Sequence, residues 1–335
     1  MNSKTIDVHA HAIPKESLER MRRDFPDWGP TFSERGGQGY IDYPDGRRDA
    51  AAPPGAYDAA VRVAEMDAQR VDLQVMSVPP YMFNYEKPTE VATGFAAVLN
   101  DGMMEMAASF PDRLHMLATL PLQDAEMSVR EITRIAGTGA VRGVEIGTNV
   151  DGANLDDPSL APVWVALEEA NLPVLVHSAR GEGSRLRSYH LTNLVGNPLE
   201  TSIAIASLIF GGVIERHPDL RFCFVHGGGF APYQIGRWDH GWACRPEAQV
   251  NITSAPSSYF QTMYVDALTH DELALSFLGD RVGWDRVMLG TDYPFDMAEV
   301  DPVGRIDALG LSDDDRERVF HRTAEAFLRP LPDAP

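Results

Sequence analysis

Eight short apolar segments recur along the whole chain, and longer stretches of helical periodicity separate most of them. They cover residues 5–11, 73–78, 114–121, 143–148, 173–178, 221–227, 263–268 and 287–294. Their residues are nearly all apolar and do not alternate with polar ones, which is typical of parallel strands buried on both faces. The segments therefore predict a sheet that is covered on both of its faces.

The intervals between these segments predict the helices that cover the sheet. Residues 89–110, 128–137, 160–171 and 198–218 carry apolar side chains at helical spacing. Strand–helix alternation repeated eight times predicts an α/β fold with (β/α)8 TIM barrel topology. A doubly wound open sheet is the competing architecture. Such a sheet usually has a glycine-rich phosphate-binding turn after its first strand, where this chain reads HAHAIPK.

The connection between the first two predicted strands, residues 12–72, is much longer than the others. Its central part, residues 26–58, is rich in Gly, Pro and Asp and has little periodicity. Loops this long in compact domains are typically lids or binding loops, or are disordered. Because no internal linker divides the chain, we expect a single domain over residues 1–335, with an inserted lid within residues 12–72.

Composition excludes several classes of function. The formal net charge is −20, whereas a nucleic-acid-binding protein shows a basic patch or stripe. The two cysteines, Cys223 and Cys244, form no CxxC pair, which favours a reduced, cytoplasmic setting. No apolar run is long enough to span a bilayer, and the N-terminus lacks the pattern of a secretory signal. We therefore expect neither a nucleic-acid partner nor a membrane partner.

Four of the eight apolar segments end in side chains that can bind a metal. His9 and His11 end the first segment, His177 the fifth, His226 the sixth and Asp292 the eighth. Residues i and i+2 of a strand point to the same side, and the carboxyl ends of barrel strands meet at one mouth. Histidines together with a carboxylate suit zinc or another divalent first-row ion. Each group could instead be an ordinary polar residue at a strand end, but four such coincidences favour a metal site.

This pattern resembles that of the amidohydrolase superfamily: HxH on the first strand, His on the fifth and sixth, and Asp on the eighth. Over nearly the whole chain the sequence is similar to the branch typified by 2-amino-3-carboxymuconate-6-semialdehyde decarboxylase. The motifs that carry the resemblance are IDVHAHAIPK, EMDAQRVDLQVMSVPPYMFNY, LATLPLQD, GVEIGTNV, NPLETSIAIASLIFGGVIERHPDLRFCFVHGGG and VMLGTDYPF. The resemblance implies that His9, His11, His177 and Asp292 bind one divalent metal, with zinc expected and manganese as the alternative.

The resemblance also implies roles for the groups beside the metal. His226 would be the acid/base that handles the metal-bound water. Glu145 occupies the strand position where binuclear relatives carry a bridging lysine, and in a mononuclear branch it is expected to be a barrel or network residue. Decarboxylation requires a proton for the carbon that loses CO₂, and an imidazole titrates in the right range. Whether His226 or Asp292 delivers that proton is open from the sequence.

A carboxylate substrate needs a cationic partner, and arginine offers a bidentate fork. The resemblance points to Arg47 or Arg48, in YPDGRRD, and to Arg237, which in similar enzymes crosses to the site of a neighbouring subunit. A homodimer is therefore expected. Met82 and Phe83, in PPYMFNY, are expected to line the substrate pocket, with packing under the lid as the alternative interpretation.

The loop after the fifth strand departs from the named decarboxylase. In that enzyme Pro-Trp-Asp follows the metal-binding histidine, whereas this chain reads HSARGEGSRLRSYHLTN. Arg180, Arg185 and Arg187 stand where an aromatic wall is expected, which favours a different or more anionic acid. Tyr189 and His190 are further candidates for the mouth of the barrel.

The sequence thus predicts a metal-dependent, non-oxidative decarboxylase of a small unsaturated or aromatic carboxylic acid. Hydrolysis or hydration of a small carboxylate-bearing substrate at the same site is the catalytic alternative. A catalytically inactive barrel that serves as a scaffold is the alternative outside catalysis. The expected partners are a small anionic carboxylic acid and a second copy of the chain.

Overall fold

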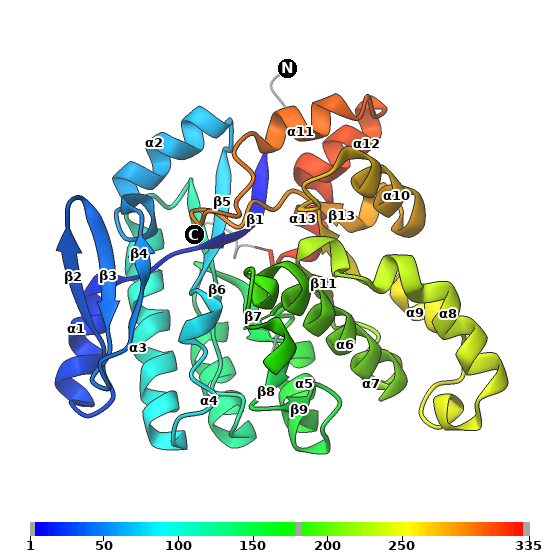
Figure 1. Ribbon diagram of the computed structural model, residues 1–335, viewed down its shortest axis with the longest axis horizontal. Coiled ribbons are helices and arrows are strands. Elements are labelled where there is room, and N and C mark those ends of the chain that lie inside the picture. Colours follow the sequence, from blue (N-terminus) through cyan, green and yellow to red (C-terminus); the bar gives the residue numbers. More distant parts are fainter. Residues whose placement is uncertain (1–3, 179–182, 331–335) are drawn as a thin grey trace.

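The computed structural model describes residues 4–178 and 183–330. Its centre is a parallel eight-stranded sheet in the order β1-β5-β6-β7-β10-β11-β12-β13. The strands are β1 (Ile6–His11), β5 (Leu73–Ser77), β6 (Leu114–Ala118), β7 (Val141–Gly147), β10 (Val174–His177), β11 (Phe222–Phe224), β12 (Tyr264–Asp266) and β13 (Val287–Met288). Each of these strands overlaps one of the predicted segments. Figure 1 shows the helices arranged around the strands.

Backbone contacts between β1 and the segment after β13 close the sheet into a barrel. The Val8 N–H donates to the Leu289 carbonyl at 3.0 Å, and the Asp292 N–H donates to the His9 carbonyl at 2.8 Å. A parallel bridge also joins Ala10 to Tyr293. The predicted TIM barrel is therefore confirmed.

Successive residues of the strands serve two different layers of the core, as the two-residue period of a strand requires. Val174 and Val176 belong to the large cluster that packs the strands against the helices. Leu175, between them, belongs to a smaller cluster that also contains Val75 and Val225. All of these side chains are buried, so the predicted burial of both faces of the sheet is confirmed.

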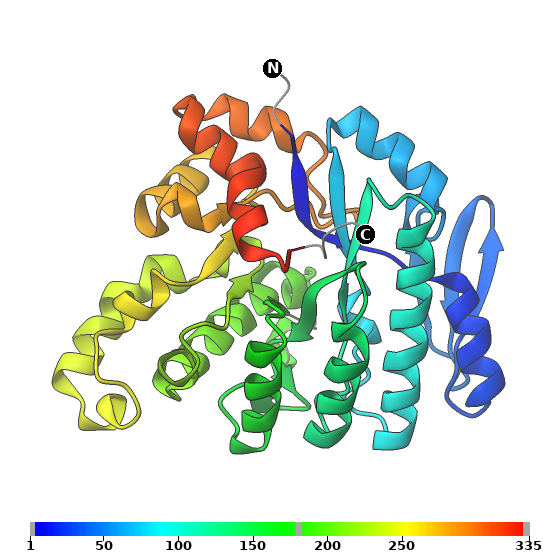
Figure 2. The ribbon, with the colours of Figure 1, turned by 180° about the vertical axis from the view of Figure 1, so that it is seen from behind.

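The helices lie outside the strands, as Figures 1 and 2 show from opposite sides. The predicted helix over residues 198–218 is divided by a glycine pair, and Gly212 has a left-handed φ of 74°. Within the described ranges, no helix is long and apolar enough to cross a membrane. The longer helices are α3 (Thr89–Ala108), α4 (Ala125–Ala136), α5 (Ala161–Glu169), α6 (Asn197–Phe210), α8 (Ala231–Cys244) and α10 (Glu272–Val282). Shorter elements are α7 (Val213–Arg216), α9 (Pro256–Phe260), α11 (Pro302–Ala308), α12 (Asp313–Glu317), α13 (Thr323–Phe327), β8 (Asn149–Val150) and β9 (Ala153–Asn154).

The long connection between β1 and β5 is more regular than its composition suggests. It contains an antiparallel sheet of three strands, which Figure 1 shows at the flank of the barrel beyond α3. Gly36 and Gly37 have φ values of 62° and 80° and form the tight turn between the first two of these strands. The elements are α1 (Lys15–Asp24), β2 (Thr31–Arg35), β3 (Gln38–Asp42), β4 (Arg48–Ala52) and α2 (Ala59–Gln69). A role for this segment as a lid remains a prediction.

The predicted strands that contain His226 and Asp292, 221–227 and 287–294, end earlier than expected. β11 ends at Phe224 and β13 ends at Met288. Farther along, the backbone leaves the extended conformation, because His226 and Asp292 have φ values of 56° and 60°. These left-handed conformations cannot continue a strand, and in non-glycine residues they are concentrated at functional sites. Both side chains therefore project from loops just beyond their strands.

Candidate metal centre

Five polar side chains converge at the carboxyl ends of the barrel strands. They are His9 and His11 of β1, His177 at the end of β10, His226 after β11 and Asp292 after β13. Ligand atoms of His9, His177, His226 and Asp292 all lie within 4.8 Å of one another. The side chains that the sequence singled out from distant segments therefore share one location.

The Asp292 carboxylate lies at the centre of this cluster. Its Oδ1 is 3.0 Å from His11 Nε2, 3.5 Å from His9 Nε2 and 4.0 Å from His177 Nε2. Its Oδ2 is 3.7 Å from His226 Nε2. Burial favours the neutral acid, but the close imidazole groups of His11, His226 and His9 outweigh it and hold the pKa of Asp292 well below its usual range. The carboxylate is therefore ionised at neutral pH.

Contacts at Nδ1 orient the rings of His9 and His177 so that Nε2 of each ring faces Asp292. His9 Nδ1 lies 2.7 Å from a carboxylate oxygen of Asp266, and His177 Nδ1 lies 2.8 Å from the Ser178 carbonyl. Because each acceptor takes a proton from Nδ1, the Nε2 lone pairs of both rings are free to bind a metal.

The Nε2 atoms of the three histidines lack hydrogen-bond partners in the described part of the chain. Nε2 of His9, His11 and His177 is buried in each case and makes no hydrogen bond there. Buried polar groups in folded proteins are nearly always satisfied. Three unpaired imidazole nitrogens around one ionised carboxylate form a donor set that fits a divalent ion such as zinc or manganese.

Asp266, at the end of β12, supports the cluster and was not identified from the sequence. It is fully buried, and besides facing His9 it accepts the Gly227 N–H at 2.8 Å. One carboxylate thus positions the His9 ring and the backbone next to His226. The only signal in the sequence is an aspartate inside the apolar run MYVDAL.

A second buried network holds the loop that carries Asp292. Asp7 accepts the Thr291 hydroxyl at 2.7 Å and the Gln74 amide at 2.8 Å. The buried Arg62 donates to the Gly55 carbonyl at 2.9 Å and also to the Gln74 side chain and the His11 carbonyl. These bonds connect β1, β5, α2 and the loop after β13, so the ligand-bearing segments are fixed to one another.

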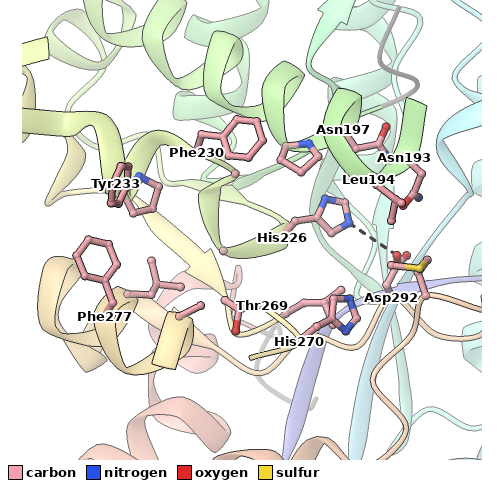
Figure 3. Close-up of a pocket in the computed structure, with 18 of the residues that line it drawn as sticks. Asn193, Leu194, Asn197, His226, Phe230, Tyr233, Thr269, His270, Phe277 and Asp292 are labelled. Carbon is pink, nitrogen blue, oxygen red and sulfur yellow. Dashed lines mark ion pairs between the residues drawn. The ribbon is translucent and has the colours of Figure 1, made fainter. Parts of the chain in front are cut away.

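Two cavities open from the cluster, one on each side of Asp292. The larger, of about 650 Å³, reaches His226 and is lined mainly by apolar side chains. Figure 3 shows the rings of Phe230, Tyr233 and Phe277 at the end of this cavity away from Asp292. The smaller, of about 190 Å³, reaches His11 and His177 and is lined by Tyr81, His190 and Phe295 among others. Asn193, Asn197, Asp292 and Met297 border both cavities.

The predicted arginine anchors lie on the surface, with different partners. The Arg48 Nε atom is 2.5 Å from Asp42 in an ion pair, so its charge is already matched. The Arg47 guanidinium lies over the Tyr43 ring, 3.9 Å from the ring centroid. Arg237 is exposed on α8, and it makes no ion pair within residues 4–178 and 183–330.

The predicted pocket residues after β5 are buried beneath the smaller cavity. Tyr81 lines that cavity, whereas Met82 and Phe83 are 3% and 5% exposed and belong to the main hydrophobic cluster. The Phe83 ring stacks on Tyr85, whose hydroxyl oxygen accepts the Gly147 N–H at 3.1 Å. This environment agrees with the alternative interpretation of packing, and contact of Met82 or Phe83 with substrate stays a prediction.

The arginine-rich loop after β10 is described only in part. Arg180 lies outside the described residues, and Arg185 and Arg187 are exposed. Tyr189 is 87% exposed, whereas its neighbour His190 lines the smaller cavity. Among the described candidates in this loop, His190 is the one that borders a cavity reaching His11 and His177.

The comparisons with known proteins agree with this geometry. The family model described as Amidohydrolase matches residues 6–329. A 2-amino-3-carboxymuconate-6-semialdehyde decarboxylase of Dictyostelium discoideum is 37% identical, over 97% of this chain and 92% of the relative. An enzyme of the same name from Caenorhabditis elegans is 30% identical, over 97% of this chain and 94% of the relative.

Solved structures share the fold. The apo form of IDCase from Metarhizium anisopliae superposes with a TM-score of 0.84 at 22% identity, covering 97% of each chain. A 5-carboxyvanillate decarboxylase of Novosphingobium aromaticivorans gives a TM-score of 0.79 at 24% identity, covering 97% of this chain and 95% of that one. The latter structure contains manganese and 4-hydroxy-3-methoxy-5-nitrobenzoic acid.

Proposed function

Because the chain belongs to the amidohydrolase family, we propose that it is a metal-dependent carboxy-lyase acting on a small unsaturated or aromatic carboxylic acid. The observation that carries the proposal is the buried convergence of His9, His11 and His177 on Asp292, because the Nε2 atoms of these histidines have no hydrogen-bond partner in the described part of the chain. Identity of 37% to a named decarboxylase over nearly the whole of both chains supports the choice of reaction.

His9, His11, His177 and Asp292 are the proposed ligands of one divalent ion. When bound, a divalent ion polarises a coordinated oxygen and lowers the pKa of bound water from about 15.7 to near 7. The nitrogen-rich donor set favours zinc, and the manganese in a structural relative makes Mn²⁺ the alternative. The proposed ligands themselves contribute a rigid frame, because Asp266 and the Ser178 carbonyl fix the His9 and His177 rings.

His226 is the proposed proton donor to the substrate. In decarboxylation the bond between the carboxyl carbon and its neighbour breaks, its electron pair stays on the neighbour, and a proton joins that carbon as CO₂ leaves. The His226 side chain borders the larger cavity and is 17% exposed, whereas those of His9, His11 and His177 are 0%, 1% and 6% exposed. The low pKa of Asp292 makes that residue the poorer donor at neutral pH.

Arginine side chains are proposed to hold the substrate carboxylate, with a second subunit supplying one of them. Arg47 is favoured over Arg48 because the latter is already paired with Asp42. Arg237 lies one helical turn after Tyr233 on α8, and Tyr233 is 78% exposed. Exposed apolar side chains around the larger cavity support a homodimer interface there: Leu194, Phe230, Tyr233, Leu273 and Phe277.

The reaction class is tested by product analysis in D₂O. The metal-loaded protein is incubated with a panel of unsaturated and aromatic carboxylic acids, and CO₂ and the organic product are both quantified. We expect CO₂ and product in equal amounts, with one deuterium on the carbon that loses the carboxyl group. Net incorporation of water without CO₂ release would show a hydrolase or hydratase instead. The absence of any turnover over a broad panel would favour the scaffold alternative.

A further inference from the structure

Glu145 is a buried acidic side chain that the proposed mechanism does not use. It lies on β7 and is fully buried, and neither of its carboxyl oxygens has a hydrogen bond within the described residues. In the sheet register Glu145 is level with Leu175, whereas Gly147 is level with His177. Glu145 thus lies one layer below His177, and the space beside Gly147 is filled by the rings of Tyr85 and Phe83.

The neighbours of Glu145 are two of the proposed metal ligands. One Glu145 oxygen, His11 Nε2 and His177 Nε2 all lie within 4.8 Å of one another. Both of those nitrogens are buried without a hydrogen bond in the same part of the chain. An acidic oxygen and two imidazole lone pairs therefore face a common point.

The contacts do not support the network role expected from the sequence. The Ser77 hydroxyl lies near the Glu145 carboxyl group. The single hydroxyl proton of Ser77 has another acceptor, since its oxygen lies 3.2 Å from the Ala10 carbonyl. A carboxylate in this position is best stabilised by a cation held among the same nitrogens.

We infer that Glu145 is a fifth protein ligand of the same divalent ion that His9, His11, His177 and Asp292 bind. A separate second ion is disfavoured because His11 and His177 would have to serve both ions, and an imidazole Nε2 has one lone pair. The inference rests on the proposed function, since it assumes that the cluster binds a metal.

A fifth ligand changes which metal the site suits. With Glu145 the donor set holds oxygens from two carboxylates, and the coordination number exceeds the four that zinc usually adopts in structural sites. Carboxylate ligands suit Mn²⁺, so a second carboxylate moves the donor set toward that metal. Glu145 should therefore contribute more to the retention of Mn²⁺ than to the retention of Zn²⁺.

The test measures metal retention rather than activity. Mn²⁺-loaded and Zn²⁺-loaded proteins are equilibrated with graded concentrations of a chelator, and the retained metal is determined by elemental analysis. The variants are Glu145→Gln and Glu145→Asp, and Glu168→Gln on α5 is the matched control because it removes a carboxylate that pairs with His217 away from the site. We expect both Glu145 variants to bind Mn²⁺ at least about 10-fold more weakly and to lose less affinity for Zn²⁺, with the control unchanged.

The other outcomes separate this inference from the proposed function. If Glu145→Gln binds Mn²⁺ as tightly as the wild type does, the inference about Glu145 is overturned. The proposed metal centre of His9, His11, His177 and Asp292 is unaffected by that result. Retention by Glu145→Asp but not by Glu145→Gln would also overturn it, because a shorter carboxylate that suffices acts through its charge and not as a ligand. Circular dichroism verifies folding, and if Glu145→Gln does not fold, then Glu145→Asp decides alone. Wild-type protein that binds neither metal would contradict the proposed function itself.

Discussion

At the scale of single residues, the chemistry of the site depends on side chains that have no role except to position others. The Asp266 carboxylate accepts from His9 Nδ1 at 2.7 Å and from the Gly227 N–H at 2.8 Å, and it is fully buried. The pKa of Asp266 is lowered, since the bonds and charge of His9 outweigh the effect of burial. An ionised Asp266 therefore fixes the tautomer that leaves His9 Nε2 free for a metal.

Replacing this carboxylate tests its positioning role. Asp266→Ala should weaken metal binding by about 10- to 100-fold, because the His9 ring loses the acceptor that orients it. Chelator competition measures the affinity, and Asp307→Ala, an exposed carboxylate on α11, is the control. Unchanged metal affinity in a folded Asp266→Ala protein would contradict the role.

Replacing His226 separates metal binding from proton transfer. His226→Ala should keep the metal but lose turnover by about 100- to 10,000-fold, because the proposed donor to carbon is absent. Elemental analysis and steady-state kinetics on the same preparation measure the two effects. If the variant loses the metal instead, then His226 is a ligand and not the proton donor. The measurement is decisive because His226 lies within 4.8 Å of three proposed ligands, His9, His177 and Asp292.

The residues that could be predicted from the sequence are those whose chemical role can be recognised without knowing their contacts in the folded chain. Five such residues each interrupt or end an apolar run, and the barrel topology brings them together: His9, His11, His177, His226 and Asp292. Asp266 and Asp7 have equally buried positions, but their importance depends on which atoms face them. That information exists only in the folded chain, since their partners lie 257 and 284 residues away.

At the scale of elements, the strands were predictable where they are buried on both faces and less so where the backbone bends. Continuous apolar runs marked all eight barrel strands, but the apolar signal continued past the ends of β11 and β13 into the left-handed residues His226 and Asp292. The sheet of β2, β3 and β4 was not predicted, because its strands are short and because β2 and β3 contain few apolar residues. The site therefore combines side chains at strand ends with two, His226 and Asp292, that lie on loops.

The barrel end opposite the metal centre supplies a stability prediction. His115, near the start of β6, is buried, and its Nδ1 lies 2.8 Å from the Arg142 guanidinium. Burial, and then the charge of Arg142, lower the pKa of His115 to about 4. In the unfolded chain a histidine has a pKa of about 6.5, so His115 binds a proton below that pH. In the folded chain His115 remains neutral until the pH approaches about 4. Stability should therefore fall as the pH drops from about 6.5 to about 4.

Urea unfolding at about pH 7.5 and pH 4.5 tests this linkage. Between these values, wild-type protein should lose about 2 kcal/mol more unfolding free energy than His115→Gln. His240→Gln, at an exposed position on α8, is the control and should behave like the wild type. An equal loss in wild type and His115→Gln would show that His115 titrates normally in the folded state.

At the scale of the whole molecule, the proposed dimer would place Arg237 of one subunit in the site of the other. In a mixture of His226→Ala and Arg237→Ala subunits, a mixed dimer has one site with both substitutions and one site with neither. Random mixing makes half of the dimers mixed, so activity should recover to about a quarter of the wild-type value. Each variant alone should stay well below that value. No recovery after subunit exchange, or full wild-type activity in a monomer by gel filtration, would contradict the shared site.

The metal content of the purified protein tests the central claim most directly. Wild-type protein and His177→Ala are purified without chelators, and bound metals are measured by elemental analysis. We predict about one equivalent of a divalent metal in the wild type and much less in the variant, because His177 supplies one of the buried unpaired nitrogens. A wild-type protein that carries no metal and takes up neither Zn²⁺ nor Mn²⁺ would show that the convergence of the histidines and Asp292 is architectural.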